Sequence, residues 1–144
     1  MQSLDDIQLT AEITQLLKEC RSIAVVGLSP KESRPSNMVG RYLLKHGYTV
    51  YPVNPGQDEI LGEQCYKALS DIPAAVDIVD IFRKSEDILP IVEEVLKLRP
   101  LPRVVWMQQG IIHEEAAALA RDAGIYVLMD RCIKVDHANF LHPA

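Results

Sequence analysis

The chain has 144 residues, of which 48% are hydrophobic and 24% are charged, and its formal net charge is −5. This length is typical of one domain with a single core, and the composition excludes bulk disorder and a low-complexity chain. The negative charge has the wrong sign for a protein that binds nucleic acid or an anionic membrane over a broad surface. Any phosphate site must therefore be local, formed by a few basic side chains.

Targeting segments and metal-ligand patterns are also missing from the sequence. No apolar run approaches the length of about 18 residues that a membrane span needs, and the first six residues lack the features of a secretory signal. We therefore expect a soluble, cytoplasmic protein. The three cysteines have no C-x-x-C spacing and the four histidines no paired spacing, so we expect reduced thiols and no metal site.

In the first third of the chain, hydrophobic periodicity and punctuation by Gly and Pro predict alternating helices and strands. Residues 1–9 are expected to be a flexible end, followed by a helix for which Thr10 is the predicted N-cap. The continuous apolar run over 22–27 predicts a central strand that is buried on both faces. Ser36 is the predicted cap of a second helix, and a second strand is expected over 48–53.

The same alternation continues to the end of the chain. Strands are expected over 76–82, 103–108 and 125–129, with a short extended piece at 60–61. Helices are expected from Ser85 or Asp87 to about 98 and over about 114–123, with a helical turn at 68–71. A final helix and a flexible tail at 141–144 end the chain. Asp77 and Asp80 interrupt an apolar strand, so we expect them near strand ends or bonded to backbone. Strict alternation predicts a single α/β domain with a doubly wound, mostly parallel five-stranded sheet and helices on both faces.

The loop after the first strand is the most informative segment. In a doubly wound sheet, ligands bind outside the carboxyl ends of the strands, where the strand order reverses. This loop combines a glycine, three hydroxyls and two cations ahead of a helix, namely Gly27, Ser29, Ser33, Ser36, Lys31 and Arg34. A helix start offers free N–H groups and a partial positive charge, so the loop predicts an anion cradle. An ordinary solvated loop with a serine cap is the alternative.

Two gaps weigh against a nicotinamide dinucleotide as the ligand. The G-x-G-x-x-G pattern is absent after the first strand, and the second strand ends at Asn54, where an acid would hold a ribose hydroxyl. An NAD(P)-binding domain therefore stays only as an alternative. A P-loop is excluded, because no G-x-x-x-x-G-K-[ST] string occurs in the chain.

Four strings, in order along the chain, resemble the small stand-alone coenzyme A-binding proteins. They are IAVVGLSPKESRPS, VYPVNP, VDIVDIFR and MDRCIKVDH. The fold of that family is similar to the CoA-binding N-terminal domain of the succinyl-CoA synthetase α subunit. The resemblance covers most of the chain and implies a Rossmann-like domain that binds coenzyme A or an acyl-CoA.

The resemblance also implies roles for particular residues. It assigns phosphate contacts to the first loop, at Gly27, Ser29, Lys31, Arg34 and Ser36. It assigns the adenosine edge and the wall beside it to Val53, Asn54, Pro55, Phe82 and Arg83, and the pantetheine arm or its sulfur to Gln108, Gly110 and Cys132. A neutral Asn54 avoids the repulsion that an acid would exert on the ribose 3′-phosphate.

Several candidate residues have a purely structural interpretation. Phe82 is equally compatible with the core, and Arg83 with a surface ion pair to Glu86. Cys132 is expected to be a small buried thiol rather than a partner for a mixed disulfide with coenzyme A. Trp106 is expected in the core, and His137 is expected to be structural or solvated rather than a general base.

No nucleophile, base and acid can be assembled from the sequence into a catalytic arrangement. The phosphohistidine and nucleotide-grasping parts of the synthetase family also have no room in 144 residues. We therefore expect a binding module for coenzyme A without catalysis of its own, with no nucleic-acid or membrane partner. The alternatives are an oxidoreductase-like NAD(P)-binding domain and a subunit that presents coenzyme A to a separate ligase or acyltransferase.

Overall fold

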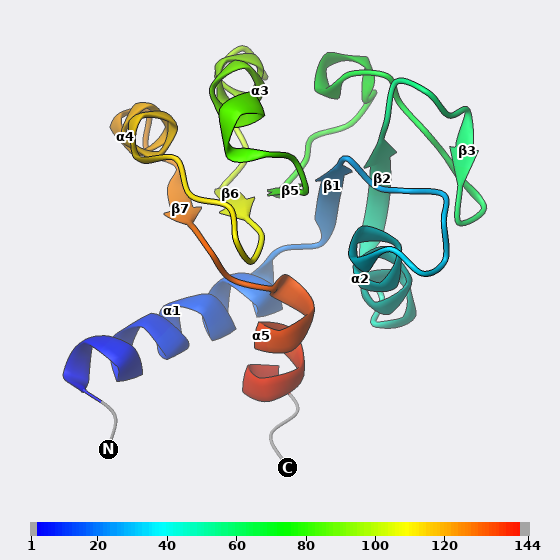
Figure 1. Ribbon diagram of the computed structural model, residues 1–144. Coiled ribbons are helices and arrows are strands. Elements are labelled where there is room, and N and C mark those ends of the chain that lie inside the picture. Colours follow the sequence, from blue (N-terminus) through cyan, green and yellow to red (C-terminus); the bar gives the residue numbers. More distant parts are fainter. Residues whose placement is uncertain (1–2, 142–144) are drawn as a thin grey trace.

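The structure of the chain is a computed structural model that describes residues 3–141 (Figure 1). Its helices are α1 (Leu4–Glu19), α2 (Pro35–Lys45), α3 (Ile88–Val95), α4 (Glu114–Asp122) and α5 (Ile133–Leu141), with 3₁₀ turns at Leu69–Asp71 and Ser85–Asp87. Its strands are β1 (Ser22–Val26), β2 (Thr49–Val53), β3 (Glu59–Ile60), β4 (Glu63–Gln64), β5 (Ile78–Ile81), β6 (Val104–Met107) and β7 (Tyr126–Leu128). No helix within residues 3–141 is both long and apolar enough to cross a membrane.

Five parallel strands form the central sheet in the order β2-β1-β5-β6-β7. The chain runs from β1 outward to β2, then returns and continues on the other side through β5, so the strand order reverses between β1 and β5. The predicted fold class, a Rossmann-like α/β domain, is confirmed. The short strands β3 and β4 form a separate antiparallel pair beside β2.

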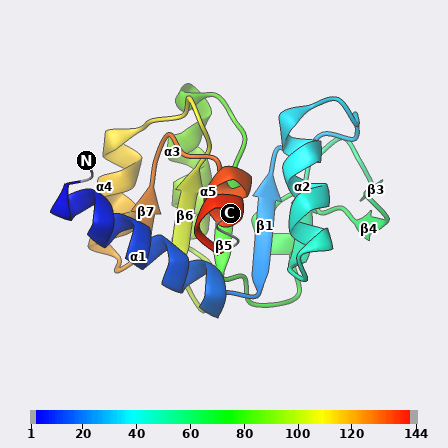
Figure 2. The same ribbon diagram turned by 90° about the horizontal axis from the view of Figure 1, so that it is seen from below.

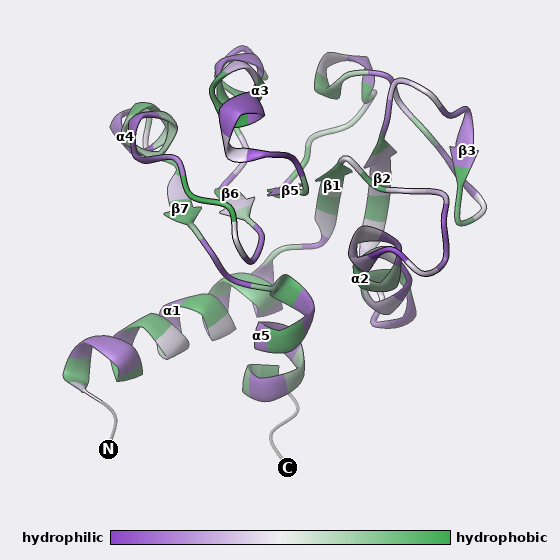
Figure 3. Ribbon diagram, in the orientation of Figure 1, coloured by the Kyte–Doolittle hydropathy of each residue, from purple (hydrophilic) through white to green (hydrophobic). Residues whose placement is uncertain are grey.

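Helices cover both faces of the sheet in two layers. Figures 1 and 2 show α1, α2 and α5 on one face and α3 and α4 on the other. Every residue of β5 and β6 is buried, which explains the continuous apolar runs of those strands. In Figure 3 apolar residues dominate the central strands, whereas apolar and polar residues alternate along the helices. Trp106 is fully buried between these layers, as expected.

The first helix starts earlier than the sequence pattern indicates. Helix α1 begins at Leu4 and not after Thr10, because the Ser3 hydroxyl accepts a hydrogen bond from the Asp6 N–H at 3.1 Å and caps the helix. The predicted flexible end is therefore helical over residues 4–9, and α5 likewise extends to Leu141. The rest of both predicted flexible ends, residues 1–2 and 142–144, lies outside the described residues.

The two aspartates near β5 differ in their surroundings. Asp77 precedes the strand and its carboxylate accepts hydrogen bonds from the N–H groups of Arg21 and Ser22, as expected. Asp80, in contrast, lies within β5, is fully buried, and has no hydrogen-bond partner among the described residues. Asp80 is thus the last residue but one of β5, near the strand end as expected, but its carboxyl is not bonded to backbone. Burial away from water raises the pKa of Asp80 well above its ordinary value and favours the neutral acid.

Candidate functional site

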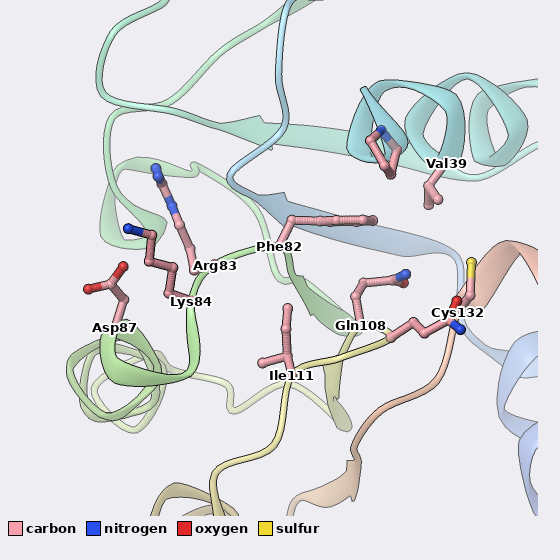
Figure 4. Close-up of a pocket in the computed structure, with 10 residues that line it drawn as sticks. Val39, Phe82, Arg83, Lys84, Asp87, Gln108, Ile111 and Cys132 are labelled. Atoms are coloured by element: carbon pink, nitrogen blue, oxygen red, sulfur yellow. The ribbon is translucent and has the colours of Figure 1, made fainter. Parts of the chain in front are cut away.

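A cleft of about 520 Å³ opens at the carboxyl ends of the strands, beside the first turns of α2 (Figure 4). Its walls come from α2 and from the segments that follow β5, β6 and β7. They are formed by Pro35, Val39, Phe82, Arg83, Lys84, Asp87, Gln108, Gln109, Ile111 and Cys132. The cleft therefore lies at the edge of the sheet where the strand order reverses, which is the usual ligand position in this fold class.

The cleft brings together four of the residues that the sequence singled out, Phe82, Arg83, Gln108 and Cys132. The remaining lining residues were not predicted as site residues, and most of them carry no recognisable signal in the sequence. Lys84 is the exception, because it follows Arg83 directly at the end of a predicted strand. Two adjacent cations at a strand end are a plausible signal for an anion site.

Charge is distributed unevenly along the cleft. Arg83, Lys84 and Asp87 lie together at one end, whereas Gln108 and Cys132 lie at the other end, with Phe82 between them (Figure 4). The ion pairs of residues 3–141 do not include Arg83, so the surface pair considered with Glu86 is not formed. The cationic end suits an anionic group, and the opposite end offers an amide and a thiol.

Gly27 sets the distance between two of the strand ends. Its backbone has a φ of +87°, and a Cβ added there would lie 2.3 Å from the carbonyl oxygen of Phe82. The Gly27 N–H donates to the Val53 carbonyl at 2.9 Å, and the Phe82 N–H donates to the Val26 carbonyl at 2.8 Å. Glycine is therefore required here by the close approach of β1 and β5, and it does not line the cleft itself.

The rest of the first loop is held by its own hydrogen bonds. Ser36 was predicted to cap α2, but the helix begins at Pro35 with Arg34 as N-cap, because proline is favoured at the first helical position. The Ser36 hydroxyl instead accepts from the Ser29 N–H at 2.9 Å, and the Ser29 hydroxyl accepts from the Lys31 N–H at 3.1 Å. Lys31 and Arg34 are exposed, and neither lines the cleft.

The end of β2 is tied to the first loop. The Asn54 side-chain amide donates to the Leu28 carbonyl at 2.9 Å, and its oxygen accepts from the Gly56 N–H at 2.9 Å. Val53 is buried and Pro55 is exposed. None of the three predicted adenosine-edge residues lines the cleft, and Asn54 acts as a brace between the loops that follow β1 and β2.

The start of α5 forms the far end of the cleft. The Gln108 side-chain oxygen accepts from the Ile133 N–H at 3.1 Å, and the Cys132 carbonyl accepts from the Asp136 N–H at 3.0 Å. Cys132 was expected to be buried, but it is half-buried and lines the cleft. Gly110 was expected beside it, yet its N–H donates to the Asp130 carboxylate at 2.6 Å, outside the cleft lining.

His137 has a structural environment, as expected. It is buried between α5 and α2, and its Nδ1 lies 2.8 Å from the Tyr42 hydroxyl. The rings of Tyr42 and Tyr48 pack edge-on against the imidazole. His137 therefore joins the two helices on this face of the sheet and stays away from the cleft lining.

The fold and the cleft define a Rossmann-like domain with a ligand-sized opening at its topological switch point. A family model described as CoA binding domain matches residues 21–138, and the chain belongs to this CoA binding domain family. Protein YneT of Bacillus subtilis is 43% identical over 128 residues, which cover 89% of this chain and 93% of YneT.

Two further relatives, one solved structure and one enzyme, bear on the fold and on the family. A hypothetical protein from Pyrococcus horikoshii has a solved structure that matches with a TM-score of 0.89 at 38% identity, over 98% of this chain and 97% of that chain. The ADP-forming acetate–CoA ligase I of Archaeoglobus fulgidus is 39% identical over 72 residues. That match covers 50% of this chain but 10% of the ligase, so this chain corresponds to a small part of that enzyme.

Proposed function

We propose that the chain binds coenzyme A, or an acyl-CoA, in the cleft at the carboxyl ends of the strands and catalyses no reaction itself. Membership of the CoA binding domain family supports the ligand class. The observation that carries the location is the cleft at the switch point, with Arg83 and Lys84 at one end. Coenzyme A is a strongly anionic ligand with a long neutral arm, and this division of charge suits it.

The charged part of the ligand fits the end of the cleft that holds the two cations. Arg83 offers a planar set of donors for a phosphate and Lys84 adds a point charge. Lys31 and Arg34 are exposed in the first loop, outside the cleft lining. Phe82 provides an apolar surface in the middle of the cleft. The neutral pantetheine arm then extends toward Gln108 and Cys132.

The lining supports binding without catalysis. Its ionisable side chains are Arg83, Lys84, Asp87 and Cys132. The only carboxylate among them, Asp87, lies at the opposite end of the cleft from the thiol (Figure 4). An adjacent general base is one way to activate a nucleophilic cysteine, and no histidine or carboxylate of the cleft lining stands beside Cys132.

A second function is favoured by one observation, the partial match to an ADP-forming acetate–CoA ligase. In this alternative the chain presents coenzyme A to a separate ligase or acyltransferase. Purification of the full chain from its source at low salt, with and without coenzyme A, tests it. A ligase or acyltransferase that copurifies and acts only with the chain would favour this alternative over a stand-alone binding protein.

Calorimetry and thermal unfolding with coenzyme A, acetyl-CoA, NAD, NADP and ATP at one salt concentration test the proposed ligand. A ligand that binds only the folded chain raises its stability, by about 2.7 kcal/mol when its concentration is 100 times Kd. We expect this stabilisation with coenzyme A and acetyl-CoA and not with NAD or NADP. Stabilisation by NAD or NADP alone would replace the proposal by a dinucleotide site.

A further inference from the structure

The two edge strands of the sheet are protected to different degrees. On the β2 edge, Pro52 has no N–H to offer, and its carbonyl accepts from the Tyr66 N–H at 2.9 Å. Two residues after Pro52, the Asn54 N–H donates to the Tyr66 carbonyl at 2.9 Å. The segment around Tyr66 therefore covers the β2 edge. On the β7 edge, no strand of residues 3–141 pairs beyond β7. An open edge is a template for another strand.

A groove of about 540 Å³ runs along this open edge. It is lined by residues 124–128 together with Leu9 and Arg121, and none of these residues lines the cleft. The Tyr126 N–H donates to the Arg103 carbonyl, on the side of β6, so alternation directs the N–H and C=O of Val127 toward the groove. β7 contains neither the proline nor the charged side chains that commonly prevent pairing at an edge.

Helix α4 borders the groove with a face that carries one negative and one positive side chain, so two copies of this face can attract each other when the helices are antiparallel. Glu114, Ala118 and Arg121 are spaced by four and three residues, which places them on one face of the helix, and all three are exposed. Arg121 lines the groove. The ion pairs of residues 3–141 include neither Glu114 nor Arg121. When two such helices lie antiparallel, Glu114 of each faces Arg121 of the other, and the small Ala118 at the centre permits close approach.

We propose that a second copy of this chain docks at the β7 edge. The two β7 strands pair antiparallel about a two-fold axis near Val127, so that its N–H and C=O exchange hydrogen bonds with those of the same residue in the second copy. The same axis places the two α4 helices side by side. Figure 2 shows the N-terminal turns of α1 reaching past β7, and Leu4 and Ile7 on those turns are 84% and 51% exposed. This inference is independent of the proposed ligand, because the groove and the cleft share no lining residue.

Sedimentation of the full chain over a wide range of concentrations tests the dimer with the variants Arg121→Glu and Glu114→Arg. Each variant replaces two symmetric attractions by two repulsions, so we expect the dimer to weaken by at least about tenfold. An equimolar mixture of the two variants restores opposite charges at both contacts, and we expect it to form a heterodimer as tight as the parent dimer. Glu93→Arg makes the same charge change as Glu114→Arg at an exposed position of α3, and this control is expected to leave the dimer unchanged.

Amide hydrogen exchange at Val127 tests the strand pairing separately, and we expect its exchange to slow as the concentration of the chain rises. Three results would overturn the proposal. They are a parent chain that stays monomeric at every concentration, a dimer that neither charge variant weakens, and a dimer whose Val127 amide exchanges as fast as in the monomer. Failure of the variant mixture to associate would likewise rule out the antiparallel contact of α4.

Discussion

The segments that follow β1 and β5 meet at the switch point, and they are built in different ways. The first is fixed by side chains, since Ser36 accepts from the Ser29 N–H and Asn37 donates to the Ser29 carbonyl. The second is a short 3₁₀ turn whose neighbouring side chains, Arg83 and Lys84, line the cleft. The comparison indicates that the first segment is held in place by its own hydrogen bonds, whereas the second supplies most of the charged side chains of the cleft lining.

The largest effect is expected where the two segments touch. Gly27→Ala places a methyl group 2.3 Å from the Phe82 carbonyl oxygen at a φ of +87°, so we expect a loss of about 3 kcal/mol or more in unfolding free energy. Gly47→Ala is the matched control, because Gly47 has a φ of +89° with nothing within 4 Å of the added Cβ. It is expected to lose about 1 kcal/mol. Equal losses in urea unfolding would show that the contact is not tight.

The division of charge between the segments is tested by Arg83→Gln and Arg34→Gln. We expect Arg83→Gln to weaken coenzyme A binding by at least about tenfold, because this guanidinium lines the cleft. Arg34→Gln, on the exposed first loop, is expected to weaken it by about threefold, since its charge is screened by water. Calorimetry with both variants measures the ratio, and a larger loss for Arg34→Gln would reverse the assignment.

The rigidity of the first segment is tested by Ser36→Ala. The substitution removes the acceptor for the Ser29 N–H, and we expect a loss of about 1 kcal/mol in unfolding free energy. Ser33→Ala, on the exposed part of the same loop, is the control and is expected to change stability by less than about 0.5 kcal/mol. Denaturant unfolding of both variants decides whether this hydrogen bond holds the loop.

The smallest effect is expected at the neutral end of the cleft. Cys132→Ser replaces the thiol of a half-buried side chain by a smaller, more polar hydroxyl on the same carbon skeleton, and we expect the Kd for coenzyme A to change by less than about threefold. Calorimetry under reducing conditions measures this change. A loss as large as that of Arg83→Gln would show that the thiol is a main contact of the ligand.

The sheet was predictable because its strands are buried on both faces and therefore appear as continuous apolar runs. Element starts were less predictable. The first two turns of α1 contain no fully buried residue, so they leave no apolar periodicity, and the local signals are the cap at Ser3 and the acidic Asp5 and Asp6 in the first turn. Pro35 takes the first position of α2, which moved the start of the helix ahead of Ser36.

The cleft was predictable in position and only partly in composition. The rule for strand ends located it, and Phe82, Arg83, Gln108 and Cys132 line it. The direction of a side chain in a loop has no periodicity, so the sequence did not reveal that Ile111 contributes to the wall. The resemblance assigned ligand contacts to Asn54, whose side chain is engaged by two backbone groups.

The buried carboxyl of Asp80 keeps its proton in the folded chain over a pH range in which the unfolded chain has lost it. Because burial raises the pKa of Asp80, the unfolded chain releases this proton above pH of about 4 while the folded chain keeps it. The contribution of Asp80 to the unfolding free energy is therefore largest below pH of about 4, and it declines as the pH rises toward the raised pKa of the folded chain. Asp80→Asn cannot ionise, so its unfolding free energy is expected to exceed that of the parent at pH 7 and to match it near pH 3.

Urea unfolding of parent and variant across this pH range measures the difference, and identical pH profiles would contradict it. While Asp80 holds its proton, the folded chain is also one charge less negative than its formal −5. Above pH of about 4, as long as folded Asp80 keeps its proton, we therefore expect the native parent and the native Asp80→Asn variant to have the same electrophoretic mobility, and the two unfolded chains to migrate differently. A side chain with no hydrogen-bond partner in the described structure thus sets a measurable part of the protein's acid–base behaviour.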